Sequence, residues 1–218
     1  MTTPDPIVIE VIKLLKYSIW PVILLITLLL FHSPLSRLLD RMQNFEFSKS
    51  ENTLTIKAAL ELDRAERDRD KNNIPSTGEI ATTVENANTQ LKRRGADSPI
   101  NVLWVDDNPG NNEREREAFT TLGFIFTLAK STKEAKSRLS AGEFNLIISD
   151  FRRDEDPEAG YGLLEYINGL DKAPPYIIYA ASATPELIAE AKSKGAFGET
   201  NRPSELMRLA VSAIAQKN

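Results

Sequence analysis

The chain has 218 residues, with 27 lysines and arginines against 31 aspartates and glutamates, and a formal net charge of −4. It has no cysteine, which excludes disulfides and thiolate metal sites, and its one histidine, His32, excludes Ser-His-Asp, Cys-His and the common two-histidine metal arrangements in the C-terminal half. Residues 1–98 carry equal numbers of both signs, so the negative excess lies in residues 99–218. This acidic half argues against nucleic acid as a partner, because phosphate contacts need a basic face.

The first landmark is an uncharged apolar stretch, YSIWPVILLITLLLF, at residues 17–31. With the two leucines just before it, the stretch reaches about 18 residues, near the lower limit for a membrane-spanning helix. Lys13 and Lys16 precede it and Trp20 suits a membrane interface. A signal peptide and a buried soluble helix are the alternatives, but the run is long for a signal core and no Ala-x-Ala-like site follows. We expect residues 1–33 to hold a single membrane span, whose flanking charges leave its orientation open.

Residues 34–98 are expected to form a partly helical spacer between the membrane and the C-terminal domain. Residues 45–56 alternate weakly, as a short strand pair would, whereas residues 56–71 favour a helix with opposite charges three and four positions apart. NNIPSTG interrupts this helix, and residues 79–95 predict a second one that ends at a glycine. The sequence leaves open whether this segment also forms a homodimer.

From residue 99 onward, strands and helices alternate regularly. INVLWV, at residues 100–105, is a nearly continuous apolar run, typical of a strand buried on both faces of a parallel sheet. Four more strands are predicted in the same way, at residues 124–128, 144–149, 176–180 and 196–200. Each strand is followed by a helical segment, at residues 113–122, 132–140, 162–170, 185–194 and 203–215. Five such units in residues 99–218 indicate an α/β domain with a doubly wound parallel sheet.

Acidic residues end two of the predicted strands. Asp106 and Asp107 follow the first strand, and Asp150 follows the third. Ligands of doubly wound sheets bind at the carboxyl ends of the strands. If the two strands are neighbours, three carboxylates meet there, and their repulsion is tolerable when a hard divalent cation such as Mg²⁺ lies among them. The alternative is that these aspartates are loop, capping or solvated residues.

At this point the pattern resembles a known family, the receiver domain of two-component response regulators. Residues 100–216 carry the resemblance, through VLWVDDNP at the first strand, LIISD at the third, GLLEYI in the third helix, Gly195–Ala196, and Arg202–Pro203 after the fifth strand. The resemblance implies a flavodoxin-like, five-stranded sheet in the order 2-1-3-4-5. It also implies a Mg²⁺ ion held by the acidic pair and a third-strand aspartate that accepts a phosphoryl group from a partner's phosphohistidine.

Carried over by position, the resemblance assigns a role to each site residue. Asp107 would bind Mg²⁺ directly, Asp106 through water, and the backbone carbonyl of Arg152 would complete the ligands. Asp150 would be both ligand and phosphoacceptor. Because His32 is the chain's one histidine, the phosphoryl donor would be a histidine kinase or phosphotransfer protein in trans, or a small acyl phosphate. A metal ion would offset the repulsion between carboxylate and phosphoryl group.

The sequence departs from the family at the positions that sense the phosphoryl group. Ala180 stands where the family has threonine or serine, and Ser182 would contact the phosphate only after a shift or bulge. Arg202 replaces the family's lysine, and its planar guanidinium is not interchangeable with an ammonium group. Glu199 replaces the aromatic switch residue.

The sequence therefore supports a membrane-anchored, receiver-like signalling protein, single-pass in the cell membrane; the receiver resemblance implies that the N-terminus lies outside and residues 34–218, with the receiver-like domain, lie in the cytoplasm. No effector domain is expected after the receiver, so output would pass through protein–protein contacts. The alternative is a non-phosphorylated pseudo-receiver that acts as a docking platform or membrane effector. A phosphatase or nucleotide hydrolase is disfavoured, because the chain lacks a Gly-rich phosphate loop; at most, we expect the receiver to promote its own phosphorylation and dephosphorylation.

Overall fold

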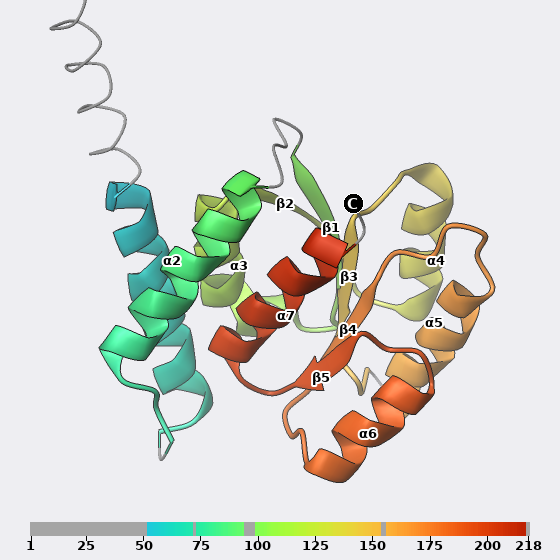
Figure 1. Ribbon diagram of the computed structural model, residues 1–218. Helices are drawn as coiled ribbons and strands as arrows, with labels where there is room; N and C mark the ends of the chain where they lie inside the picture. The colour runs from blue at the N-terminus through green and yellow to red at the C-terminus, as the bar shows by residue number, and fades with distance from the viewer. Residues whose placement is uncertain (1–51, 72, 94–98, 154–155, 217–218) are drawn as a thin grey trace, which may run out of the picture. The chain divides into compact units, whose positions relative to one another are not determined.

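The computed structural model describes residues 52–71, 73–93, 99–153 and 156–216 (Figure 1). All of these residues belong to one compact unit. The predicted membrane span at residues 17–31 lies outside the described residues. Across the residues that are described, no helix combines the length and the apolar character needed to cross a membrane.

The centre of the unit is a parallel sheet of five strands. Their order is β2-β1-β3-β4-β5, which confirms the order 2-1-3-4-5 predicted from the sequence. The strands are β1 (Ile100–Val105), β2 (Phe124–Ala129), β3 (Leu146–Ser149), β4 (Tyr176–Tyr179) and β5 (Gly198–Thr200). In the register of β1 and β3, Val105 pairs with Ser149, so both strands end at the same level of the sheet.

Helices cover both faces of the sheet (Figure 1). One face carries α3 (Glu113–Thr121) and α7 (Pro203–Gln216), and the other carries α4 (Thr132–Ala141), α5 (Ala159–Asn168) and α6 (Pro185–Ser193). A short 3₁₀ helix, Pro109–Asn112, leads from β1 into α3. Side-chain caps begin two of these helices: the Ser131 hydroxyl accepts a hydrogen bond from the Glu134 N–H at 3.2 Å, and the Thr184 hydroxyl accepts one from the Leu187 N–H at 3.4 Å.

Alternate residues of β1 supply two separate cores. Val102 and Trp104 pack on the α3/α7 side, and Leu103 and Val105 pack on the α4/α5/α6 side. The Trp104 ring is 1 % exposed and makes an edge-to-face contact with Tyr179, at 5.9 Å between ring centroids. Burial on both faces explains why β1 reads as a continuous apolar run rather than as an alternating one.

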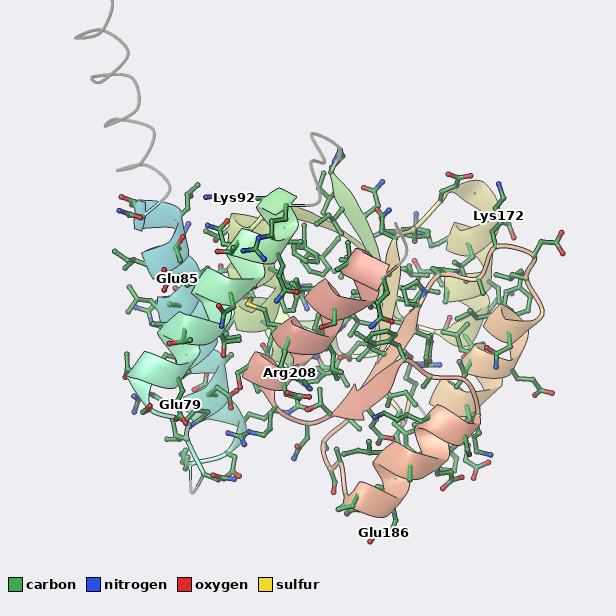
Figure 2. All side chains as sticks on the ribbon, in the orientation of Figure 1. Glu79, Glu85, Lys92, Lys172, Glu186 and Arg208 are labelled. Atoms are coloured by element: carbon green, nitrogen blue, oxygen red, sulfur yellow. The ribbon has the colours of Figure 1, made fainter. Side chains whose placement is uncertain are left out.

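Two further helices lie on the α3/α7 face. The first covers residues 52–69, the second is α2 (Thr77–Arg93), and together they form what we call the hairpin, residues 52–93 (Figure 1). Its buried side chains join the core that α3, α7 and the sheet form; they include Ala58, Leu62, Ile80, Val84 and Ala87. The charged residues Glu79, Glu85 and Lys92 of α2 are exposed (Figure 2).

Part of the predicted spacer packs against the receiver. Residues 34–98 are predicted from the sequence to be a spacer, whereas residues 52–93 pack against the receiver helices. The predicted strand pair at 45–56 is wrong from residue 52 onward, where the chain is helical; residues 45–51 lie outside the described residues. The alternation of Thr53 to Ile56 is too short to outweigh the helical spacing of the buried Ala58, Leu62 and Ala65.

Candidate functional site

The ends of β1 and β3 bring the three acidic residues together. The Asp106 N–H donates to the Ala129 carbonyl at 2.9 Å, and the Asp150 N–H donates to the Val105 carbonyl at 2.8 Å, so the sheet itself fixes both backbones. One carboxylate oxygen from each of Asp106, Asp107 and Asp150 lies within 4.8 Å of the others. The convergence predicted from the sequence is therefore present. We call these three residues the acidic cluster.

Asp106 is the most firmly held member of the acidic cluster. It is 5 % exposed, and its Oδ1 accepts a hydrogen bond from the Asn108 N–H at 2.7 Å. Its Oδ2 accepts one from the side-chain amide of Asn112 at 2.5 Å. Asp107 and Asp150 are half-buried, which leaves their carboxylates accessible from solvent. The cluster thus combines one oriented carboxylate with two that a ligand can reach.

The electrostatics of Asp150 fit a site built for a cation. Burial raises the pKa of Asp150, and the charges of Asp106 and Asp107 raise it further. A hydrogen bond of 2.8 Å from the Phe151 N–H to Oδ1 and the charge of Arg153 act in the opposite direction on this pKa. Three oxygen donors at this spacing are the ligands that Mg²⁺ prefers, and a divalent cation would relieve the repulsion among them.

Arg153 is a buried residue of this site, only 3 % exposed. Its guanidinium donates to the Asp150 carbonyl at 2.6 Å, to the Ala159 carbonyl at 2.6 Å and to the Thr132 hydroxyl at 3.0 Å, and it also contacts the Ser149 hydroxyl. These acceptors are all neutral, so Arg153 fixes the loop between β3 and α5 rather than pairing with the acidic carboxylates. The Arg152 side chain is exposed, and the role of its carbonyl as a metal ligand stays a prediction.

The end of β4 differs from the end of β3. Ala180 is buried, and its N–H donates to the Thr200 carbonyl at 3.1 Å, which extends the pairing of β4 with β5 by one residue. Ser182 follows two residues later and is exposed. The regular pairing at Ala180 does not supply the bulge that would make Ser182 its equivalent, and a phosphate contact of Ser182 stays a prediction.

Two more of the altered positions lie around β5. Arg202 lines a cavity of about 310 Å³ together with Glu79 of α2. Hydrogen bonds from Ser76 lower the pKa of Glu79, and the charge of Arg202 lowers it further. Glu199, at the position of the family's aromatic residue, is buried; burial raises its pKa, and its Oε2 has no hydrogen-bond partner among the described residues. Arg202 thus faces the hairpin in this structure.

The sequence analysis missed one cation at the site, Arg69 of the 52–69 helix. Its Nη1 donates to the Asn112 Oδ1 at 3.2 Å, its Nη2 donates to the Ala180 carbonyl, and its guanidinium lies 4.1 Å from the centroid of the Tyr179 ring. The Tyr179 hydroxyl in turn donates to the Glu115 carboxylate at 2.8 Å, and burial raises the pKa of both groups. No sequence signal pointed to Arg69, because it lies in a separate element well before the receiver.

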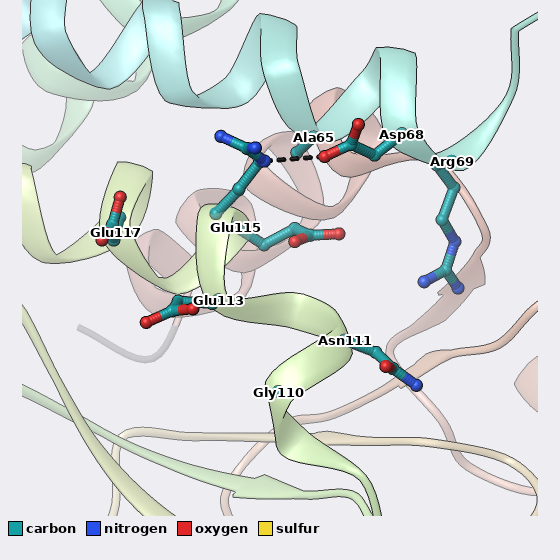
Figure 3. A pocket seen from close by; sticks show the side chains of 9 residues that line it. Ala65, Asp68, Arg69, Gly110, Asn111, Glu113, Glu115 and Glu117 are labelled. Carbon is teal, nitrogen blue, oxygen red and sulfur yellow. Dashed lines mark hydrogen bonds and ion pairs between the residues drawn. The ribbon is translucent and has the colours of Figure 1, made fainter.

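A cavity of about 320 Å³ lies beside this contact, between the 52–69 helix and the start of α3 (Figure 3). Its lining includes Asp68 and Arg69 from the helix and Glu113 and Glu115 from α3. The dashed line in Figure 3 ends on Asp68 and marks its ion pair with Arg114, at 2.6 Å. The cavity mixes both signs of charge and gives no indication of a particular ligand.

Comparison with known proteins agrees with this geometry. Residues 102–213, slightly more than half of the chain, match the family model described as the response regulator receiver domain. The chain belongs to the response-regulator receiver family. The receiver domain therefore extends from β1 into α7, and the three carboxylates lie at the carboxyl edge of its sheet. A comparison with curated proteins finds no match.

Several solved structures are similar to the receiver domain. The chemotaxis response regulator CheY4 of Vibrio cholerae is 21 % identical, with a TM-score of 0.47, over 54 % of this chain and 99 % of that one. A response regulator receiver protein from Pseudomonas putida is 24 % identical, with a TM-score of 0.47, over 54 % and 99 % of the two chains. The CheX–CheY–BeF₃–Mg²⁺ complex from Borrelia burgdorferi matches at 23 % identity and a TM-score of 0.46, over 52 % and 88 %.

Proposed function

We propose that this protein is a membrane-anchored signalling receiver that accepts a phosphoryl group on Asp150, with Mg²⁺ bound by the acidic cluster. One observation carries the proposal: carboxylate oxygens of Asp106, Asp107 and Asp150 lie within 4.8 Å of one another at the carboxyl edge of the sheet. Like charges gathered in this way cost free energy unless a cation offsets them. The cluster is therefore better explained by a bound ion than by its contribution to folding.

The accessibility of each carboxylate supports the division of roles. Asp107 and Asp150 are half-buried and would bind the ion directly, together with the carbonyl of Arg152. Asp106 is buried and already accepts hydrogen bonds from Asn108 and Asn112, so it would contact the ion through water rather than directly. When bound, Mg²⁺ would neutralise the charge that otherwise keeps an anionic phosphoryl group away from a carboxylate.

Asp150 is suited to the transfer because its carboxylate is accessible while its backbone is fixed by β1 and Arg153. One of its oxygens forms the new O–P bond as the N–P bond of a partner's phosphohistidine breaks. The imidazole leaves and takes up a proton from solvent. A histidine kinase or a phosphotransfer protein would be the donor; with acetyl phosphate, a P–O bond breaks and acetate leaves.

The membrane part of the proposal is supported by the uncharged stretch at residues 17–31, which would anchor the chain as a single-pass protein with its receiver in the cytoplasm. The output would then be a protein–protein contact near the membrane. On the receiver, α4, α5 and α6 cover the face that the hairpin leaves uncovered. A downstream partner would reach these helices more directly than the covered α3 and α7.

The test is phosphorylation of the purified full chain by acetyl phosphate, followed by intact-mass measurement. We expect the mass of one phosphoryl group to be added in the presence of Mg²⁺ and not after chelation of divalent ions. Asp150→Asn should abolish the addition. Asp156→Asn, which removes an exposed carboxylate from the same loop, is the matched control and should leave it intact.

Phosphorylation that persists in Asp150→Asn, or that needs no divalent ion, would contradict the proposal.

The second candidate is a receiver that binds partners without being phosphorylated. It is favoured by Ala180, which brings no hydroxyl to the end of β4, and by Arg202, which lines a cavity against the hairpin. Partner binding that is unchanged by Asp150→Asn, in a chain that acetyl phosphate does not modify, would support this candidate.

A further inference from the structure

Arg69 connects the hairpin to the acidic cluster through a chain of hydrogen bonds. Asp106 Oδ2 accepts from the Asn112 amide at 2.5 Å, and the carbonyl oxygen of the same amide accepts from Arg69 Nη1 at 3.2 Å. The other end of the guanidinium donates to the carbonyl of Ala180. A single side chain of the hairpin thus holds the loop after β1 and the end of β4 at the same time.

The position of Ala180 brings this contact close to Asp150. In the register of β3 and β4, Ser149 pairs with Ile178, so the residues after Ile178 continue along the strand beside Asp150. Arg69 also lies over the Tyr179 ring, at 4.1 Å from its centroid, which fixes the plane of the guanidinium. The cation is therefore held at the edge of the sheet where the three carboxylates meet.

The C-terminal turns of the 52–69 helix are docked on the receiver by two other contacts. Asp68 pairs with Arg114 of α3 at 2.6 Å, and the Glu66 carboxylate accepts a hydrogen bond from the Ser204 N–H, at the start of α7, at 2.7 Å. Glu66 is 1 % exposed. These contacts keep the helix in place, so a change in the Arg69 contact acts on a docked element rather than on a free chain.

We propose that Arg69 is a positioning residue that couples the acidic cluster to the hairpin. It holds Asn112 against Asp106 in the metal-free protein, and binding of a divalent cation weakens this contact and loosens the end of the 52–69 helix. One physical reason supports the proposal: the Asn112 amide, held by Arg69, occupies an oxygen of Asp106 that the hydrated ion would also use.

The inference rests on the metal site of the proposed function, and thermodynamic linkage makes it testable. If cation binding weakens the Arg69 contact, removing Arg69 must strengthen cation binding by the same factor. The change would act at the C-terminal turns of the 52–69 helix, where Arg69 lies, and would alter how the hairpin is docked on the receiver.

The experiment measures Mg²⁺ affinity of the full chain by calorimetric titration. Arg69→Gln is expected to bind Mg²⁺ about fivefold more tightly, the lower end of typical coupling between sites. Arg67→Gln is the matched control, because Arg67 lies on the same helix and pairs with Asp63 at 2.7 Å on an exposed surface. This control should bind Mg²⁺ like the unaltered protein.

Two further variants separate positioning from a simple effect of charge. Arg69→Lys keeps the charge but lacks the planar fork that reaches Asn112 and Ala180 together, so it should also tighten Mg²⁺ binding. In a chain that already carries Asn112→Ala, adding Arg69→Gln should not change the Mg²⁺ affinity further, because the contact between these two side chains is already lost. As a second readout, Mg²⁺ should increase amide hydrogen exchange at residues 61–71 in the unaltered chain and not in Arg69→Gln.

Each outcome has a distinct meaning. Mg²⁺ binding by the unaltered chain with an equal affinity in Arg69→Gln overturns the coupling and leaves the proposed function standing. Tightening in Arg69→Gln but not in Arg69→Lys also overturns it. A chain that binds no Mg²⁺ in any variant overturns the proposed metal site and the coupling with it.

Discussion

Two arginines approach the acidic cluster from opposite faces of the sheet, and they differ in origin and surroundings. Arg153 belongs to the receiver's own loop after β3, is 3 % exposed and binds neutral oxygens next to α4 and α5. Arg69 comes from the hairpin, is half-buried and contacts Asn112 and Tyr179 on the α3/α7 face. One arginine is built into the receiver, and the other is brought to it by an added element.

The two faces of the receiver sheet differ in their helical layers, because the hairpin adds a second layer on the α3/α7 face while the five-stranded sheet stays the same. The α4/α5/α6 face has one layer of helices, whereas α3 and α7 lie between the sheet and the hairpin (Figure 1). The added layer buries apolar side chains in the same core as Trp104. It also delivers a charged group, Arg69, to the site edge, so packing of the hairpin and the chemistry of the site are linked on this face.

The largest expected effect tests whether the hairpin is part of the folded receiver. Leu62 is fully buried in the shared core, so Leu62→Ala should lower the free energy of unfolding of the full chain by about 3 kcal/mol, measured by urea denaturation. Leu60→Ala, on the same helix but 51 % exposed, is the control and should change it little. A cost of Leu62→Ala no larger than that of Leu60→Ala would show that the hairpin does not pack as described.

A smaller effect on the free energy of unfolding is expected from replacing Arg153, the arginine on the α4/α5/α6 face. Arg153→Met should lower the free energy of unfolding by about 2 kcal/mol, because Ser149, Asp150 and Ala159 lose a buried donor that water cannot replace. Arg152→Met, one residue earlier with an exposed side chain, is the control. Equal stability of the two variants in urea would mean that the Arg153 contacts do not hold the loop.

Arg153→Met should also change the pH dependence of Mg²⁺ binding. The charge of Arg153 lowers the pKa of Asp150, while burial raises it, so Arg153→Met should raise this pKa further. Protons and Mg²⁺ compete for the carboxylate, and Mg²⁺ affinity should therefore begin to fall at a higher pH in Arg153→Met than in the unaltered chain as the pH is lowered. Identical pH profiles of Mg²⁺ binding would show that Arg153 has no electrostatic effect on Asp150.

Much of the receiver could be predicted from the sequence because its strands carry unambiguous signals. The run at residues 100–105 is apolar throughout since β1 is buried on both faces, and the aspartates that end β1 and β3 meet because parallel strands share one carboxyl edge. The helices predicted to start at residues 132 and 185 do start there, each directly after a capping residue, Ser131 or Thr184. The strands and the acidic cluster could therefore be predicted from local sequence patterns and from one topological rule, that parallel strands share a carboxyl edge.

The hairpin and Arg69 depend on tertiary contacts that leave no such pattern. Residues 56–69 and 79–93 are helical as predicted, but their charged composition suggested a solvated spacer, and only a few small or apolar side chains per helix make the packed face. The contact between Arg69 and Ala180 joins residues 111 positions apart. The preference of Arg153 for neutral oxygens follows from burial that the sequence does not reveal.

The most direct measurement is anomalous diffraction from crystals of the protein grown with Mn²⁺ in place of Mg²⁺. The account predicts one anomalous peak among the carboxylates of Asp106, Asp107 and Asp150, lost in crystals of Asp107→Asn. A peak elsewhere on the receiver, or none at a concentration that saturates ordinary Mg²⁺ sites, would contradict it.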